Sequence, residues 1–238
     1  MATTVIDAHN VSKTYSNGPI EVKAIQHVHL HIEKGEFVAL VGPSGSGKTT
    51  LLNMLGGLDA PTTGNVLVNG ADITSMTENK LIDFRLHNIG FVFQSFNLIP
   101  VLTARENIEF IMLLQKRSKE ERKKRTDELL VSIGLQDKAN AKPGELSGGQ
   151  QQRVAVARAL ASYPQFVLAD EPTANLDSAA AANLLDIMEK LNREEQITFI
   201  FSTHDQRVIQ RARRVITLVD GAVSNDTLQK PIEHLETS

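Results

Sequence analysis

FVALVGPSGSGKT, residues 37–49, joins an apolar run to a glycine-rich loop. Phe37 to Val41 is typical of a buried β-strand, and Lys48 to Leu55 continues in a helical pattern that stops at Gly56-Gly57. Residues 42–49 have the spacing of a P-loop, in which backbone N–H groups and a helix N-terminus bind phosphate oxygens. Because strand, loop and helix follow in that order, a glycine turn that only caps a helix is much the weaker interpretation.

The residues of this loop are candidates for binding a nucleotide. We expect Lys48 to hold the β- and γ-phosphates and Thr49 to ligate Mg²⁺. The nucleotide-binding residues predicted in this segment are Gly42, Pro43, Ser44, Gly45, Ser46, Gly47, Lys48, Thr49 and Thr50.

A second apolar run, Phe166 to Ala169, ends in two carboxylates, Asp170 and Glu171. Open α/β sheets bind ligands at the carboxyl ends of their strands, so this position suits a nucleotide site. We expect Asp170 to position Mg²⁺ through water, and Glu171 to orient the attacking water or take a proton from it. Acids at strand ends are also common as solvated turn residues, but the P-loop upstream favours the catalytic interpretation.

Length and composition suit one catalytic domain. The chain has 238 residues, 41% of them hydrophobic and 22% charged, and a formal charge of −3, so composition gives no reason to expect a nucleic-acid partner. It contains no cysteine, which excludes disulfides and thiolate metal sites. The densest apolar runs are too short to span a bilayer, so a role at a membrane would require a partner.

The order of patterns predicts an α/β fold, with a mostly parallel P-loop NTPase core, an antiparallel β subdomain and an inserted helical subdomain. Short alternating runs before residue 40 predict antiparallel strands. Helical patterns from about Leu98 to Tyr163 predict the insertion, and a strand at Ile197 to Phe201 returns to βαβ alternation. We expect one domain over residues 1–238, with the core at about 1–94 and 164–238 and the helical subdomain at about 95–163.

Leu146-Ser147-Gly148-Gly149-Gln150 carries a family resemblance. These residues match the signature motif of ABC ATPases without a mismatch. From the residues alone, Ser147 caps a helix running to about Ala161, and the glycines leave its N-terminal amides open to an anion. The resemblance implies that Ser147, Gly148, Gly149 and Gln150 face the γ-phosphate held by a second copy of the chain, with two ATP molecules buried between the two copies.

Further elements of this family occur in order. The resemblance implies that Tyr15 stacks on adenine, that Gln94 reaches Mg²⁺ or the attacking water, and that His204 contacts the γ-phosphate. Asn175-Leu176-Asp177 resembles the D-loop, so Asp177 joins the predicted nucleotide-binding residues. Taken singly, Gln94 and His204 are more often structural residues, and tyrosines like Tyr15 are common in half-buried sheet positions. The predicted catalytic set is Glu171, His204, Lys48 and Gln94; the predicted metal ligands are Thr49, Gln94 and Asp170.

The similarity extends from about Val5 to Val223. Runs such as Gly90 to Gln94 and Leu168 to Thr173 look like those of the ATPase subunits of lipoprotein-releasing and macrolide-exporting systems. In that group the partner is an FtsX-like permease with a large extracytoplasmic domain. The resemblance implies a peripheral dimer on the cytoplasmic side of the cell inner membrane, which uses ATP and Mg²⁺ to drive export or extraction of lipoprotein, macrolide or peptide-like cargo.

Three alternatives compete with this interpretation. Soluble ABC ATPases of DNA maintenance or ribosomes usually carry a long coiled coil or a tandem ATPase domain, and neither pattern is present in the sequence. A module that senses ATP without turnover has no need of Glu171, Asp170, Lys48 and His204 together. An ATPase that uses its permease to activate a cell-wall enzyme, without transport, is compatible with the sequence.

Lys116 to Arg125 carries seven basic residues and two acids. We favour a solvated helix face, which is the commoner origin of such a run. The alternative is a patch for anionic lipid headgroups that includes Lys123, Lys124 and Arg125.

Overall fold

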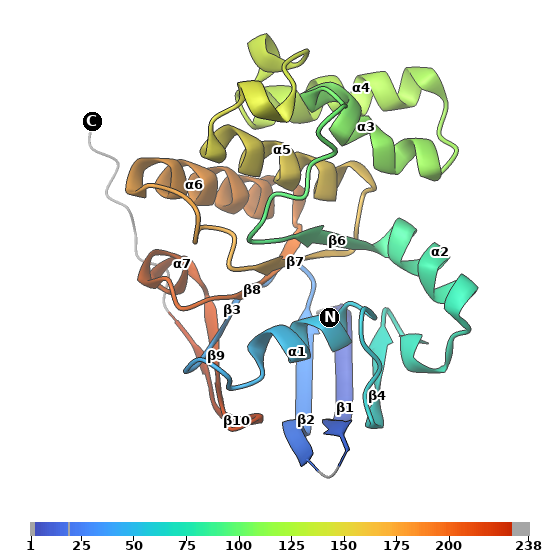
Figure 1. Ribbon diagram of the computed structural model, residues 1–238, viewed down its shortest axis with the longest axis vertical. Coiled ribbons are helices and arrows are strands. Elements are labelled where there is room, and N and C mark those ends of the chain that lie inside the picture. The colour runs from blue at the N-terminus through green and yellow to red at the C-terminus, as the bar shows by residue number, and fades with distance from the viewer. Residues whose placement is uncertain (1–2, 19, 230–238) are drawn as a thin grey trace.

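The computed structural model describes residues 3–18 and 20–229. The ends of the predicted domain, residues 1–2 and 230–238, and Pro19 lie outside the described residues. Two β-sheets pack with a helix between them, and a group of helices covers the far face of the second sheet (Figure 1).

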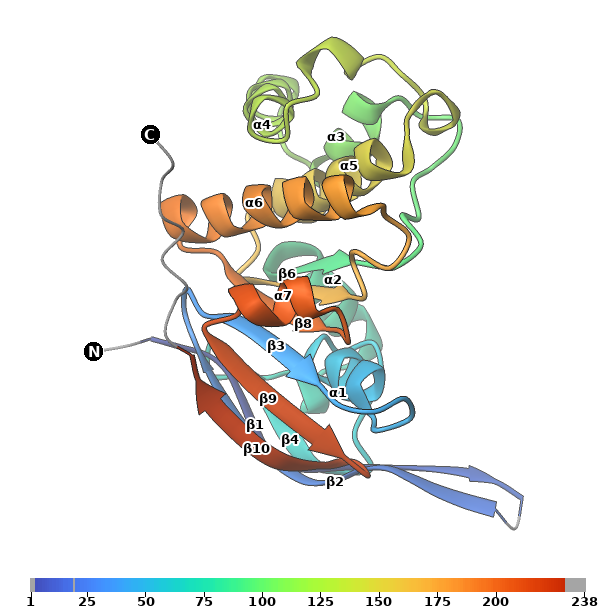
Figure 2. The ribbon, with the colours of Figure 1, turned by 90° about the vertical axis from the view of Figure 1, so that its left-hand side faces the viewer.

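The first sheet is antiparallel, as expected from the alternating runs before residue 40. Its strand order is β2-β1-β4-β5. The strands are β1 (Thr4–Asn17), β2 (Ile20–Glu33), β4 (Thr63–Val68) and β5 (Ala71–Asp72). Strand β4 pairs with β1 only as far as Ser12, so the outer part of the β1-β2 hairpin is two-stranded and projects from the molecule (Figure 2).

The second sheet has the order β10-β9-β3-β8-β7-β6, and only its β9-β10 edge is antiparallel. Its strands are β3 (Phe37–Val41), β6 (Ile89–Val92), β7 (Phe166–Asp170), β8 (Thr198–Ser202), β9 (Arg214–Val219) and β10 (Ala222–Leu228). A mostly parallel core sheet beside an antiparallel sheet confirms the predicted fold class.

The helices are α1 (Lys48–Leu55), α2 (Glu78–Asn88), α3 (Ala104–Leu114), α4 (Lys119–Ser132), α5 (Gly148–Ala161), α6 (Ser178–Glu195) and α7 (Gln206–Arg211), with short 3-10 turns at Ile73–Ser75, Gln136–Lys138 and Pro143–Glu145. Helices α3, α4 and α5 lie together, far from the first sheet (Figure 1), inside the range predicted for the helical insertion. The predicted boundaries of that insertion remain a prediction. Across the described part of the chain, no helix has both the length and the apolar character needed to cross a membrane.

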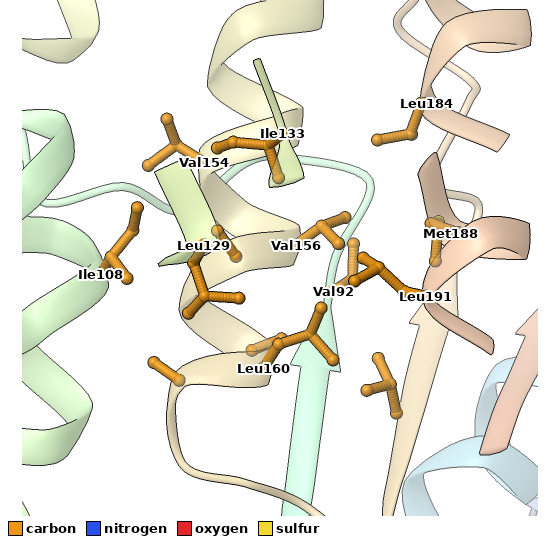
Figure 3. Packing of buried hydrophobic residues seen from close by; sticks show 14 of the residues in the cluster. Val92, Ile108, Leu129, Ile133, Val154, Val156, Leu160, Leu184, Met188 and Leu191 are labelled. Atoms are coloured by element: carbon orange, nitrogen blue, oxygen red, sulfur yellow. The ribbon is translucent and has the colours of Figure 1, made fainter. Parts of the chain in front are cut away.

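Alternation along the parallel strands gives the second sheet two apolar faces. In β7, Phe166 and Leu168 pack with α1 and the first sheet, whereas Val167 and Ala169 face the other core, formed by α3 to α6. A strand buried on both sides needs a continuous apolar run, which is the pattern seen in the sequence. Figure 3 shows the second core, to which α5 contributes Leu160, α6 contributes Leu191 and β6 contributes Val92.

The basic run at residues 116–125 does not form one exposed face. Arg125 is 7% exposed, its guanidinium lies 4.3 Å from the centre of the Tyr163 ring, and it donates to the Leu160 carbonyl and the Glu195 carboxylate. Including Arg125 in a lipid-binding patch was therefore wrong, because its charge is engaged inside the helical group. Lys123 and Lys124 are exposed.

Candidate functional site

Three parallel strands deliver the candidate catalytic residues to one edge of the second sheet. Leu40 of β3 and Asp170 of β7 both pair with Ser202 of β8, so the three strands end at the same level. The P-loop follows β3, Glu171 follows β7 and His204 lies two residues beyond β8. The parallel register thus brings together residues more than a hundred positions apart. Open α/β sheets bind their ligands at this carboxyl edge.

The P-loop requires glycine where it passes closest to other backbone. Gly42 has φ +147°, and a Cβ there would lie 2.1 Å from the Leu218 carbonyl oxygen. Gly47, in the left-handed region at φ +97°, precedes α1, and a Cβ there would lie 2.4 Å from the Ala24 carbonyl oxygen. Both clashes are with backbone, which cannot move aside, so these glycines fix the path of the loop.

The ammonium group of Lys48 is held over the loop by two hydrogen bonds. Its Nζ donates to the carbonyls of Gly42 and Pro43, both at 2.9 Å. A lysine has three N–H donors, so one remains for a phosphate oxygen. The same side chain therefore braces the loop and presents positive charge to the ligand.

Thr49 and Asp170 supply neighbouring oxygen atoms suited to Mg²⁺. The Thr49 hydroxyl donates to Oδ1 and Oδ2 of Asp170, each at 3.2 Å. Hydroxyl and carboxylate oxygens are the hard ligands that Mg²⁺ prefers, with the remaining positions commonly filled by phosphates and water. The donor set fits the ion, and Thr49 and Asp170 would hold it.

Glu171 and His204 form a close pair. The Nδ1 atom of His204 lies 2.6 Å from Oε1 of Glu171, while the Thr203 hydroxyl donates to Oε2 at 3.2 Å. A carboxylate accepts only, so Nδ1 carries the proton of this bond. Nε2 of His204 can then donate to a phosphate only in the imidazolium form. Glu171 adopts φ +45°, a conformation uncommon for a residue with a side chain. Its carboxylate contacts His204, whereas that of Asp170 contacts Thr49.

Asp205 links the loop of His204 to the chain after Glu171. Its carboxylate accepts from the buried Thr173 hydroxyl at 2.6 Å and from Arg207 Nη2 at 2.7 Å. Partial burial raises the pKa of Asp205, but hydrogen bonds from Arg207 and Thr173 outweigh it and lower the pKa to about 2. The carboxylate is thus a permanent anchor near the candidate catalytic pair.

A hollow of about 340 Å³ lies at this edge of the sheet. It is lined by residues 44, 45 and 47 to 50, by Glu171 and Ser202, and by residues 22–24 on the outer part of β2. Tyr15 lies on β1 directly opposite Val22 and is 44% exposed. An exposed aromatic ring beside a phosphate-binding loop can stack on a nucleotide base.

Other predicted site residues lie outside this hollow. Gln94 is exposed two residues after β6, and its carbonyl accepts from Asn175 Nδ2 at 3.0 Å; the hydrogen bonds of the described residues include none from its side chain. Asp177 caps α6, accepting from the Ala180 amide at 2.8 Å. Ser147 caps α5 as predicted and is exposed.

The signature segment is built for a close approach of two helices. The lining residues of the phosphate hollow, among those the structure describes, include none of residues 147–150. A Cβ on Gly149 would lie 2.8 Å from the Cβ of Ala180, so this glycine has a packing role between α5 and α6. Gly148 has more room, since its nearest neighbour would be Phe96 at 3.5 Å.

Sequence reasoning missed Gln152. This fully buried side chain of α5 donates to the carbonyls of Phe93, at 3.3 Å, and Pro172, at 2.8 Å. These carbonyls flank Gln94 and Glu171. The available signal was an amide within the apolar face of a helix, which must find buried partners.

A P-loop, a hydroxyl and carboxylate pair suited to Mg²⁺, and a glutamate and histidine at the edge of a parallel sheet define a nucleoside-triphosphate hydrolase of the P-loop class. Comparison with known proteins gives the family. The model of the ABC transporter family matches residues 25–174, and the chain belongs to this family. It is therefore an ATPase of the ABC type, which binds and hydrolyses ATP.

Three relatives show which members of the family this chain resembles. A lipoprotein-releasing system ATP-binding protein LolD of Rhodopseudomonas palustris is 45% identical, over 92% of this chain and 98% of its own length. A macrolide export ATP-binding/permease protein MacB of Hyphomonas neptunium is 44% identical over 97% of this chain but 36% of its own length. The ATP-binding cassette MJ0796 of Methanocaldococcus jannaschii has been solved as a dimer in a post-hydrolysis state bound to ADP and Pi. It is 45% identical, with a TM-score of 0.86, and the match covers 94% of this chain and 99% of the MJ0796 chain.

Proposed function

We propose that two copies of this chain close head to tail around two ATP molecules, and that the cycle of closing and opening drives a membrane permease. One feature carries the proposal. The P-loop, Asp170, Glu171 and His204 meet at one edge of the sheet, whereas Ser147 to Gln150 lie outside that hollow at the N-terminus of α5, where Ser147 is exposed. A second copy would bring this anion-binding end to the γ-phosphate. The dimeric state of MJ0796 supports this arrangement.

Each group has a distinct task in hydrolysis. Lys48 and the P-loop amides bind the phosphates, and Tyr15 stacks on the adenine. Thr49 and Asp170 would hold Mg²⁺, and the ion would supply positive charge to neutralise the phosphates.

Glu171 accepts a proton from the attacking water or orients it, and the bond from His204 Nδ1 fixes the direction of its carboxylate. Gln94, at the start of the helical insertion, would report the state of the site to the helices. Asp177, next to the signature helix, would contribute at the interface between copies.

The proposed partner is an FtsX-like permease, with the ATPase held peripherally on the cytoplasmic side of the cell inner membrane. Similarity to proteins named for lipoprotein release and macrolide export favours export or extraction of lipoprotein, macrolide or peptide-like cargo. MacB is named as both ATP-binding protein and permease in one chain, and the present chain matches about a third of it.

ATP-dependent dimerisation tests the proposal. Glu171→Gln should retain ATP binding, lose at least about a hundredfold in kcat, and run as a dimer by light scattering with Mg²⁺-ATP and as a monomer without it. Adding Ser147→Arg should abolish that dimer, because a large cation at the α5 N-terminus blocks the second anion site. The matched control is Glu194→Gln on the exposed face of α6, which should behave as the unmodified protein. A Glu171→Gln chain that stays monomeric at saturating ATP would refute the head-to-tail mechanism.

A further inference from the structure

The Tyr15 hydroxyl is bound by a carboxylate that is not among the nucleotide-binding residues predicted from the sequence. The hydroxyl donates to Oδ2 of Asp59 at 2.6 Å. Lys13 donates to Oδ1 of the same carboxylate at 2.5 Å and to the Ala60 carbonyl at 2.7 Å, and its ammonium lies 4.9 Å from the centre of the Tyr15 ring. The Asp59 carboxylate therefore joins Tyr15 and Lys13 of β1, which lie forty-four and forty-six positions earlier, to the loop after α1.

We propose that Asp59, braced by Lys13, is a positioning residue that fixes the Tyr15 ring for the base of the bound nucleotide. The inference rests on the proposed stacking of Tyr15 on adenine. It adds a specific residue, remote in sequence from the P-loop and the signature segment, that determines how well the base is held.

The topology explains why such an anchor is needed. Beyond Ser12 the strand β1 has lost its β4 neighbour, and Tyr15 pairs only with Val22 of β2. Two-stranded ribbons are marginally stable by themselves. Thr62 holds the backbone of this segment by accepting from the Thr14 amide at 3.0 Å, but the direction of the exposed Tyr15 ring depends on its side-chain partners.

Asp59 also links the position of the Tyr15 ring to that of the phosphate site. It follows α1 by four residues, and the N-terminus of that same helix carries Lys48 and Thr49 of the phosphate site. The backbone amides of Leu58 and Asp59 donate to the Asn53 carbonyl of α1, at 2.8 and 3.3 Å, so the loop that carries Asp59 is tied to the helix that begins at the phosphate site. A ring already in the bound orientation loses less conformational freedom on binding, which strengthens affinity without altering the chemical step.

Electrostatics supports the contact. Partial burial and the hydrogen bond to Asp59 raise the pKa of the Tyr15 phenol, against an opposing effect of the nearby Thr50 hydroxyl. Partial burial raises the pKa of Asp59, but the hydrogen bonds from Lys13 and Tyr15 outweigh it and lower that pKa. The charged and titratable groups at this contact are Lys13, Tyr15 and Asp59.

The chain offers a clean spectroscopic probe, because it contains two tyrosines and no tryptophan. Tyr163→Phe keeps the ring that packs on Arg125 and leaves Tyr15 as the sole tyrosine. In this background, ATP should quench Tyr15 fluorescence, and the ionisation of Tyr15 can be followed by ultraviolet absorbance.

Asp59→Ala in that background should raise the Kd and KM for ATP about tenfold, the loss expected from one charge-assisted hydrogen bond. We expect kcat at saturating ATP to stay within about twofold, because the chemical groups are untouched. The Tyr15 pKa should fall toward that of a free phenol. Asp59→Asn, which can still accept from the hydroxyl, should recover part of the affinity. Asp83→Ala, on the exposed face of α2, is the matched control and should change none of these quantities.

Tyr15→Ala separates failure of this inference from failure of the proposed base contact. If Tyr15→Ala weakens ATP binding but Asp59→Ala does not, the ring stacks on the base without needing Asp59, and the positioning role is wrong. If neither variant weakens binding, the adenine contact itself is wrong and the inference falls with it. In a Tyr15→Phe chain, Asp59→Ala should have little further effect; a full additional loss would show that Asp59 acts by another route.

Discussion

Replacing Gln152 with methionine should destabilise the protein and slow ATP hydrolysis together. Methionine matches the length of glutamine, so no large cavity forms, but the Phe93 and Pro172 carbonyls lose their donor. Each buried carbonyl left unpaired costs about 1–3 kcal/mol, and removing Oε1, a buried atom with no partner among the described residues, offsets part of that. We expect a net loss of about 2–3 kcal/mol in the free energy of unfolding.

A loss of that size should lower Tm by about 4–12 °C in a chain of this length. Hydrolysis should slow because Pro172 follows Glu171, whose positive φ is costly and must be held by its surroundings. Thermal unfolding followed by circular dichroism, and kcat at saturating ATP, are the two measurements.

Gln151→Met is the matched control, since Gln151 donates one part-buried bond, to the Leu146 carbonyl at 3.1 Å, and should cost about 1 kcal/mol. Equal effects of the two substitutions, or a Tm for Gln152→Met within about 1 °C of the unmodified protein, would refute this role of the buried amide.

Gly42→Ala should abolish ATP binding and lower Tm, because the new methyl group would lie 2.1 Å from the Leu218 carbonyl oxygen. Equilibrium binding and calorimetry check this, and unchanged affinity and Tm would contradict it. Asp205 contributes stability above its unfolded pKa near 3.8 that is lost as the pH falls toward 2. Asp205→Asn should therefore lose about 1 kcal/mol at pH 7, after discounting for solvent screening, but very little below pH 2; equal losses at both would contradict the Arg207 contact. Lys48→Ala should weaken ATP binding at least about tenfold, measured by fluorescence titration.

The core strands were predictable because burial on both faces leaves a continuous apolar run. Phe166 to Ala169 and Ile197 to Phe201 were each placed within one residue of β7 and β8. The last turn of α6, up to Glu195, gives no apolar signal because it is charged. Helix α2 gave no signal, because none of its residues is buried.

The candidate site was predictable where its residues follow one another in the chain. The P-loop, and the pair of Asp170 and Glu171 after an apolar strand, are each recognised from a short continuous stretch of sequence. The contact of His204 with Glu171 depends on strand register, and the contact of Asp59 with Tyr15 on a loop forty-four residues away, so neither is encoded in a local pattern.

Isolation of the tagged Glu171→Gln chain from its native membranes with Mg²⁺-ATP, followed by mass spectrometry of what copurifies, tests whether this ATPase drives the proposed machine. We predict a stoichiometric FtsX-like permease with a large extracytoplasmic domain, and its identity would narrow the cargo. Copurification of a many-helix importer permease, or of soluble proteins alone, would contradict the proposed partner.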